Sequence, residues 1–312
     1  MDLSCGTGTT AAPINSPLGG SRKRMKISKG LITAAGEPHR RIPLQTLVDS
    51  GGVTRTVLSM LVSEVLGSGI EQVCVIVPSG EEAVYAKAAE GFGDALHFLP
   101  QDGPPGYAQA ILRARHFLGP EPFVHLVGDH VYVRGRAGNL AQRVVDLAAE
   151  EGCCVSAVQP THESGIGRFG VVGGRPLANR RFIYTVDSVV EKPTPTAAEE
   201  CLAVSGLRAG YYLAFFGIHV FTPEFLEILE RQTAEAQEQG TTVSSALAEL
   251  ARRSRYLAVQ SEGRRYDLGP KYGLLRSQLA LTLNGPDREE LLASLVELLS
   301  NHSAPGGRSS GE

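Results

Sequence analysis

A carboxylate at the end of an apolar run is the first feature of this sequence that could do chemistry. The segment 123–127 is almost continuously apolar, and Gly128 and Asp129 follow it directly. Such a run is typical of a buried parallel strand, and ligands bind beyond the carboxyl ends of such strands. Asp129 is therefore suited to hold a hard cation such as Mg²⁺, which in turn binds phosphate oxygens. Alternatively, Asp129 only caps the turn that follows.

A second aspartate and an acid–base pair repeat this pattern later in the chain. Asp267 ends another extended run shortly before Gly269, although a turn residue would look the same. Glu191 and Lys192 follow the predicted strand 182–190 and precede a proline. A lysine suits a phosphate because it carries a compact charge, and a carboxylate accepts hydroxyl donors. An exposed Glu–Lys pair on the surface is the alternative.

Two further loops add groups suited to a nucleotide. The first predicted strand, 30–35, ends in Ala35 and Gly36, and the loop after it brings Arg40 and Arg41 to the strand end. A loop rich in Gly and Pro, residues 102–106, opens a predicted helix that contains Gln109. The amide of Gln109 offers a donor and an acceptor together, as reading a base edge requires. Gln109 could equally be an exposed helix residue.

Alternating elements are predicted to position these residues in the first half of the chain. The pattern gives strands at 30–35, 72–77, 95–99 and 123–127, and helices at 54–66, 81–89, 107–117 and 139–150. This alternation predicts an α/β fold with a Rossmann-like, doubly wound and largely parallel sheet.

The second half of the chain has a different rhythm. Strands are predicted at 153–158, 169–172, 182–190, 211–221 and 256–259, and the middle three have no helix between them. Helices are predicted from Pro223 and over 242–251, 272–283 and 287–299. A run of strands without helices predicts a mixed sheet with a small antiparallel extension.

Bulk composition excludes several classes of protein. The chain has 312 residues and a formal net charge of −3, which gives no electrostatic reason to expect nucleic acid as a partner. No apolar run approaches the roughly 18 residues of a membrane span. The five cysteines are odd in number and lack C-x-x-C spacing, so we expect free thiols in the cytoplasm. We expect a disordered leader at 1–26, one α/β domain at 27–300 and a flexible tail at 301–312.

Taken together and in order, these motifs resemble those of the bacterial sugar-1-phosphate nucleotidyltransferases. The closest resemblance is to the UTP–glucose-1-phosphate uridylyltransferases, with the thymidylyltransferases as cousins. The motifs are the loop after the first strand, Gly106–Ala110, Gly128-Asp129, Glu191-Lys192-Pro193 and Tyr266–Gly269. The resemblance implies an enzyme that joins a nucleoside triphosphate to a sugar 1-phosphate and releases pyrophosphate. It also allows a homo-oligomer.

The resemblance further implies a role for each candidate residue and a Mg²⁺ cofactor. The implied roles are catalysis for Arg40 and Lys192, nucleotide binding for Ala35, Gly36, Gln109 and Gly128, sugar binding for Gly170 and Glu191, and metal binding for Asp129 and Asp267.

The first loop departs from the family signature G-x-G-T-R. The matching residues here are Gly36, Glu37, Pro38, His39 and Arg40. A proline offers no N–H to a phosphate, and Glu37 adds a negative charge beside a triphosphate. Arg40 still matches the signature arginine. The sequence therefore predicts a uridylyltransferase-like enzyme, and the alternative is an impaired relative that binds a sugar phosphate or sugar nucleotide in a regulatory or scaffolding role.

Overall fold

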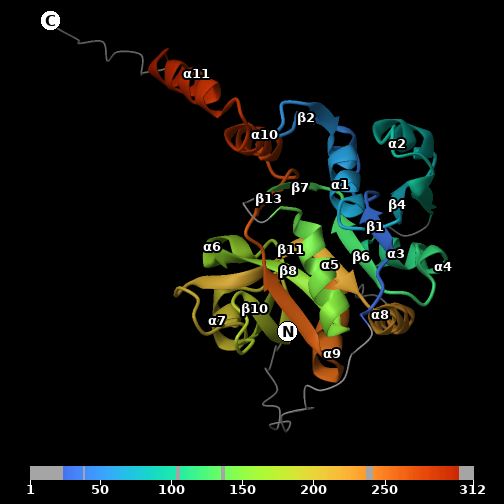
Figure 1. The fold of residues 1–312 in the computed structure, drawn as a ribbon. Helices are drawn as coiled ribbons and strands as arrows, with labels where there is room; N and C mark the ends of the chain where they lie inside the picture. Colours follow the sequence, from blue (N-terminus) through green and yellow to red (C-terminus); the bar gives the residue numbers. More distant parts are fainter. Residues whose placement is uncertain (1–23, 38, 103–105, 135–137, 237–241, 302–312) are drawn as a thin grey trace, which may run out of the picture.

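A nine-stranded mixed sheet forms the centre of the molecule (Figure 1). The computed structural model describes residues 24–37, 39–102, 106–134, 138–236 and 242–301. The strand order is β5-β4-β1-β6-β11-β8-β12-β10-β9. Residues 1–23 of the predicted leader (1–26), Pro38 and residues 302–312 of the predicted tail (301–312) lie outside the described residues.

The first half of the sheet is parallel, as the alternation of elements predicted. Its strands are β1 (Lys29–Thr33), β4 (Gln72–Pro78), β5 (Leu96–Gln101) and β6 (Phe123–Val127). The helices that follow in this half are α1 (Val57–Leu66), α2 (Glu82–Ala88), α3 (Tyr107–Arg113), α4 (Arg115–Leu118) and α5 (Leu140–Glu151).

The second half of the sheet is mainly antiparallel. The long strand β11 (Tyr211–Phe221) pairs in antiparallel fashion with β6 and with β8 (Cys154–His162). Strand β12 (Tyr256–Gln260) is parallel to β8, whereas β10 (Ile183–Glu191) is antiparallel to β12 and to β9 (Gly170–Pro176). The predicted fold class, a doubly wound mixed sheet with an antiparallel part, is confirmed.

Side chains of neighbouring strand residues enter two separate hydrophobic cores. In β1, Leu31 packs into one core and Ile32 into the other, because successive residues of a strand point to opposite faces. One core includes buried residues of α1 and α5. The opposite core includes buried residues of α3, α8 (Pro223–Glu235) and α9 (Val243–Arg253).

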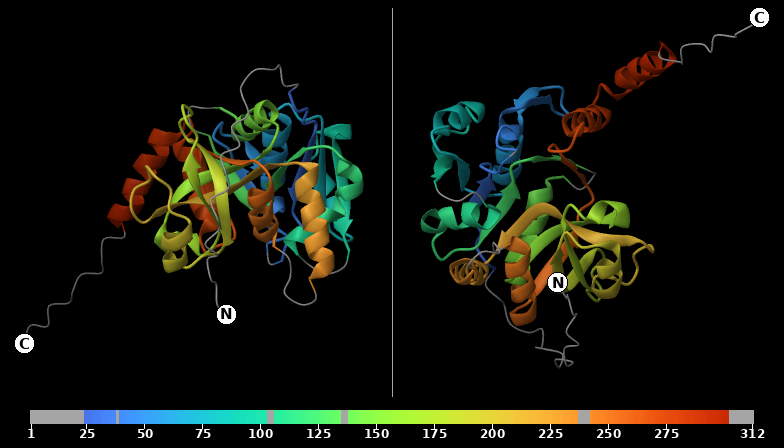
Figure 2. Two further views of the ribbon diagram at one scale, coloured as in Figure 1. Left: turned by 90° about the horizontal axis from the view of Figure 1, so that it is seen from below. Right: turned by 180° about the vertical axis from the view of Figure 1, so that it is seen from behind.

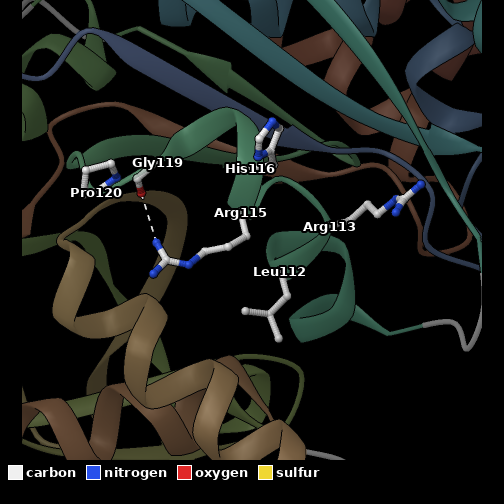
Figure 3. Close-up of a pocket in the computed structure, with 6 residues that line it drawn as sticks. All are labelled: Leu112, Arg113, Arg115, His116, Gly119 and Pro120. Carbon is white, nitrogen blue, oxygen red and sulfur yellow. Dashed lines mark hydrogen bonds between the residues drawn. The ribbon is translucent and has the colours of Figure 1, made fainter.

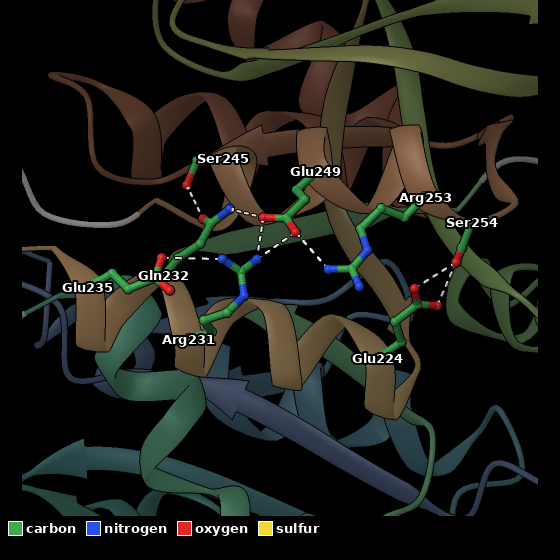
Figure 4. Close-up of polar contacts among 8 residues, drawn as sticks. All are labelled: Glu224, Arg231, Gln232, Glu235, Ser245, Glu249, Arg253 and Ser254. Atoms are coloured by element: carbon green, nitrogen blue, oxygen red, sulfur yellow. Dashed lines mark hydrogen bonds and ion pairs between the residues drawn. The ribbon is translucent and has the colours of Figure 1, made fainter. Parts of the chain in front are cut away.

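A polar network joins α8 to α9 at the surface of the second core (Figure 4). Glu249 accepts hydrogen bonds from Arg231 at 2.5 Å, Gln232 at 2.8 Å and Arg253 at 2.8 Å. These donors lower the pKa of Glu249 to about 2, and the hydrogen bond from Gln232 contributes most. At one end of the same interface, Ser254 donates to Glu224. The network fixes how α9 lies against the sheet, which matters because α9 begins beside the candidate site.

Several predicted elements have different boundaries in the structure. The predicted helix 54–66 begins only at Val57, because Thr54–Thr56 forms β3, which pairs with β2 (Thr46–Val48). Thr56 then caps α1 by accepting from the Ser59 amide at 3.0 Å. The predicted helix 107–117 is divided at Ala114 into α3 and α4.

In the second half of the chain one further prediction was wrong and another was confirmed. A helix, α7 (Pro195–Cys201), separates β10 from β11 where none was expected, with Pro195 in its first turn. The extended run that ends in Asp267 is β13 (Arg264–Asp267), which pairs with β7 (His130–Val133) outside the large sheet. Strand β7 begins directly after Asp129.

The last two helices extend from one end of the molecule. Figures 1 and 2 show α10 (Gly273–Leu283) and α11 (Arg288–Asn301) leading away from the body of the fold. Among the described residues, no helix is both long and apolar enough to cross a membrane. Cys74, Cys153 and Cys154 are free thiols, as expected, and all three are buried.

Candidate active site

The candidate site forms where the carboxyl ends of two neighbouring parallel strands meet. Thr33 of β1 lies opposite Val127 of β6, and the Gly128 amide donates to the Thr33 carbonyl at 2.9 Å. A Cβ at Gly128 would lie 2.6 Å from that carbonyl oxygen and 3.0 Å from Cα of Ala34. Only glycine therefore lets the ends of β1 and β6 approach this closely. The contact brings Asp129 beside the loop that follows β1.

A cleft of about 550 Å³ opens at this edge of the sheet. The loops after β1 and β6, the end of β5, the start of α3 and the end of β10 line it. Of the predicted site residues it contains Gly36, Gly128, Asp129, Glu191 and Lys192. A second hollow of about 360 Å³ shares Glu191 and Lys192 with the cleft and also contains Gly170. We call these two spaces the nucleotide cleft and the acceptor pocket, after the ligands that the sequence resemblance predicts for them.

Two histidines contact the carboxylate of Asp129. Nδ1 of His39 lies 3.0 Å from one carboxylate oxygen, and Nδ1 of His130 lies 3.2 Å from the other. The ring of His39 packs so tightly over Gly269 that a Cβ there would lie 2.2 Å from the ring. His39 occupies the position of the signature threonine, so the altered loop directly engages Asp129.

His130 is buried, and its 3.2 Å contact with Asp129 lacks the geometry of a hydrogen bond, so within the described part of the protein neither ring nitrogen is hydrogen-bonded. Burial lowers the pKa of His130 to about 4, although Asp129 opposes that shift. The imidazole is therefore neutral at pH 7. Because His130 lines both the nucleotide cleft and the acceptor pocket, it offers an uncharged donor or acceptor at the point where they join.

Asp267 lies close to Asp129 because of the pairing between β7 and β13. It is opposite His130 in this pair, and the Leu268 amide donates to the Asp129 carbonyl at 3.0 Å. One Asp267 oxygen accepts from the Gly269 amide at 2.9 Å. In the part of the chain that the structure describes, no three His, Cys, Asp or Glu side chains are arranged to hold a metal by themselves.

These donors fit a Mg²⁺ ion, which is commonly bound through one or two carboxylates together with substrate phosphates. Asp129 and Asp267 provide hard oxygen ligands, and the Asp129 side chain is 29% exposed at the cleft. His39 is hydrogen-bonded to one of the oxygens that such an ion would use.

The Glu191–Lys192 segment lies between the nucleotide cleft and the acceptor pocket. Lys192 has a left-handed backbone with φ of 49°, which is unusual for a residue other than glycine. Its amide donates to the Phe169 carbonyl at 3.0 Å, which holds this conformation. Glu191 accepts from the Ser244 hydroxyl at 2.5 Å. A strained backbone held by specific contacts is characteristic of functional sites.

Gly170 is required for packing beside this segment. A Cβ on Gly170 would lie 2.6 Å from the ring of Phe215 and 2.7 Å from the hydroxyl oxygen of Ser244. The predicted role of Gly170 in sugar binding stays a prediction, but its place in the acceptor pocket agrees with it.

Four predicted site residues do not line the nucleotide cleft or the acceptor pocket: Ala35, Arg40, Gln109 and Asp267. Arg40 forms an ion pair with Glu37 at 2.9 Å, and Glu37 itself lines the cleft. The buried hydroxyl of Tyr85 donates to the Arg40 carbonyl and anchors the loop.

Gln101 lines the cleft where Gln109 was expected to contribute. The side-chain amide of Gln101 donates to the Gly106 carbonyl at 3.2 Å, and both residues line the cleft. Gln101 was not among the predicted site residues, although its position at the end of β5 was an available signal. The contact of His39 with Asp129 was not predicted either, because it depends on how the loop folds back.

Another hollow, of about 600 Å³, lies near α3 and α4 and away from these residues (Figure 3). Its arginines are already engaged: Arg113 pairs with Asp102, and Arg115 donates to Gly119 and pairs with Glu230. None of the predicted site residues lines it.

The chain matches a family profile and a curated relative over most of its length. The profile of the nucleotidyl transferase family matches residues 29–282. A UTP–glucose-1-phosphate uridylyltransferase of Streptococcus pyogenes is 27% identical over 298 residues, covering 87% of this chain and 94% of the relative.

Solved structures share the fold. The crystal structure of a UDP-glucose pyrophosphorylase complexed with UDP-glucose has a TM-score of 0.68 at 21% identity, covering 82% of this chain and 98% of that one. A UTP-bound enzyme from Acinetobacter baumannii, named UGPase, has a TM-score of 0.67 at 20% identity, covering 88% of this chain and 100% of that one.

Proposed function

Because the chain belongs to the nucleotidyl transferase family, we propose that it joins UTP, or dTTP, to glucose 1-phosphate or a related sugar 1-phosphate and releases pyrophosphate. The observation that carries this proposal is the shared lining of the nucleotide cleft: Gly36, Gly128, Asp129, Glu191 and Lys192 come from three segments and meet at one sheet edge. Relatives named for UTP and UDP-glucose support the choice of base and sugar.

In the proposed reaction, an oxygen of the sugar phosphate attacks the α-phosphorus of the triphosphate. The bond from that phosphorus to the oxygen that bridges to the β-phosphate breaks, and pyrophosphate leaves. Lys192 holds the sugar phosphate as a point charge, and Glu191, oriented by Ser244, accepts sugar hydroxyls. Catalysis of this type depends on positioning and on neutralising charge at phosphate oxygens.

The nucleotide is expected to lie along the first loop and α3. Gly36 and Gly128 leave room for the phosphates, and Gln101 with Gly106 is the candidate for reading the base in place of Gln109. Asp129 and Asp267 would hold Mg²⁺, which supplies charge neutralisation at the phosphates when bound. Arg40 would neutralise charge on the triphosphate once its ion pair with Glu37 breaks.

A second function, binding of a sugar nucleotide without efficient turnover, is favoured by the first loop. Glu37 pairs with Arg40, and His39 occupies an oxygen of Asp129. Both contacts must break before the loop engages a triphosphate and metal. We therefore expect slow transfer in the protein as given.

The test is an assay of pyrophosphate release with UTP or dTTP, several sugar 1-phosphates and Mg²⁺. We expect weak activity with UTP, and a higher rate in the variant Pro38→Gly with His39→Thr. No turnover in either protein, together with calorimetric binding of UDP-glucose, would establish the binding function instead. Absence of both turnover and binding of any sugar nucleotide would contradict both functions.

A further inference from the structure

A buried arginine faces the acceptor pocket without a carboxylate partner. Arg265 lies on β13 and is only 9% exposed, whereas its neighbour Arg264 is exposed on the other face. Successive strand residues point to opposite faces, so Arg265 and Asp267 lie on the same face. Arg265 also lines the acceptor pocket.

The contacts of Arg265 leave most of its donors unused. One guanidinium nitrogen donates to the Phe215 carbonyl, and the guanidinium carbon lies 3.8 Å from the centre of the Phe169 ring. Among the described residues, Arg265 forms no ion pair and no other side-chain hydrogen bond. Since a guanidinium carries five N–H donors, several stay without a protein acceptor.

Burying an unpaired charge costs free energy. Buried charges are normally paired or hydrogen-bonded. An anionic ligand is the simplest partner for a guanidinium that lines a pocket and has no carboxylate beside it.

The surroundings of Arg265 are also positively charged. The guanidinium of Arg265 lies over the Phe169 ring, and the Phe169 carbonyl accepts a hydrogen bond from the Lys192 amide at 3.0 Å. Phe169 therefore contacts both cationic residues. Arg168 lines the same pocket, and its guanidinium carbon lies 5.3 Å from the centre of the Phe169 ring. The pocket's one carboxylate among the described lining residues, Glu191, is engaged by Ser244.

We propose that Arg265 binds an oxyanion of the acceptor sugar, either its phosphoryl group or a carboxylate on its ring, and so selects anionic acceptors. This inference rests on the proposed function and adds a binding residue to it. The planar fork of the guanidinium matches two oxygens of a phosphate or carboxylate at once, which Lys192 cannot do.

The experiment compares Arg265→Met with wild type in calorimetric titrations. The ligands are glucose 1-phosphate, glucuronic acid 1-phosphate and UTP. UTP tests whether the substitution also changes binding in the nucleotide cleft. Arg264→Met is the matched control, since it removes the neighbouring charge from the outer face. Arg265→Lys keeps a charge and a donor for the Phe215 carbonyl, and it replaces the Met variant if that variant melts at a lower temperature.

We expect Arg265→Met to bind both sugar phosphates about ten- to a hundredfold more weakly and UTP normally. Equal losses for the two sugar phosphates identify the phosphoryl group, whereas a loss confined to glucuronic acid 1-phosphate identifies the carboxylate. Unchanged binding of both, or an equal loss for UTP or in Arg264→Met, overturns the proposal. If wild type binds neither sugar phosphate, the proposed function fails as well, so the two failures are distinguishable.

Discussion

The two walls of the site handle their charges in opposite ways. On the wall formed by the first loop, charged groups are satisfied by one another: Arg40 pairs with Glu37 at 2.9 Å, and His39 contacts Asp129 at 3.0 Å. On the opposite wall, Lys192 has only a loose contact with Glu191 at 3.9 Å, and Arg265 has no carboxylate partner among the described residues.

This difference indicates that the two walls are prepared for ligands to different degrees. The acceptor wall already presents unpaired cations to a sugar phosphate, so little has to rearrange on binding. The nucleotide wall must first break its own contacts, and the free energy for doing so has to come from the triphosphate. We therefore expect substitutions on the acceptor wall to weaken binding and substitutions on the nucleotide wall to strengthen it.

The largest effect is expected at Asp129, where the walls meet. Asp129→Asn removes the charge that would hold Mg²⁺, and a metal contributes several kcal/mol of transition-state stabilisation. We expect pyrophosphate release to fall about a thousandfold. Steady-state assays measure this, with Asp187→Asn, exposed on β10 and paired with Arg175, as control. A loss under tenfold would show that Asp129 does not hold the ion.

On the acceptor wall, Lys192→Ala is expected to weaken binding of glucose 1-phosphate. A charge-assisted contact of this kind is worth about 1.5–3 kcal/mol, or about ten- to a hundredfold in affinity. Calorimetry measures the change, and Lys87→Ala, exposed on α2, should leave the affinity as it is. Equal affinity in the Lys192 variant and wild type would remove Lys192 from the acceptor wall.

Beneath the acceptor wall, the buried His219 makes stability depend on pH. Burial lowers its pKa to about 3, and its ring contacts the Ser156 hydroxyl at 2.6 Å. The unfolded chain takes up a proton near pH 6.5 and the folded protein does not, so stability is full above that pH. It is lost as the pH falls towards 3, by about 1.4 kcal/mol per pH unit.

Urea unfolding at pH 7.5 and pH 5 measures this loss. His219→Asn should lose less stability than wild type between the two pH values. The His125 ring centre lies 6.0 Å from that of His219, and burial lowers the pKa of His125 as well, so His125→Asn should also reduce the loss. An identical loss in wild type and both variants would rule out the histidines as its source.

The smallest effect is expected on the nucleotide wall. Glu37→Gln removes a negative charge from the cleft and releases Arg40. Since exposed ion pairs contribute less than about 1 kcal/mol, UTP should bind about two- to fivefold more tightly. The control is Glu81→Gln, which touches Arg41 at 4.0 Å and does not line the cleft. Weaker UTP binding in Glu37→Gln than in wild type would contradict the proposed difference between the two walls.

Much of the fold could be predicted from the sequence because local patterns determine it. Apolar runs with Gly-rich ends gave the parallel strands, and the apolar spacing of α1 and α5 gave their helices. Errors occurred where a neighbour overrides the local pattern. Thr54–Thr56 directly precedes the helical apolar spacing that begins at Val57 and was expected to extend that helix, but pairing with β2 makes it a strand.

For the site, sequence alone determined which residue types stand at strand ends: Gly128-Asp129, Glu191-Lys192 and Asp267 follow extended runs, and chain order fixes that. Only the tertiary structure decided their partners. His39 reaches Asp129 because the first loop folds back over Gly269, and Arg265 faces the acceptor pocket because β13 pairs with β7 instead of joining the large sheet. Such contacts join segments distant in sequence, and the free energy of burying and pairing their charges depends on the whole fold rather than on any local pattern.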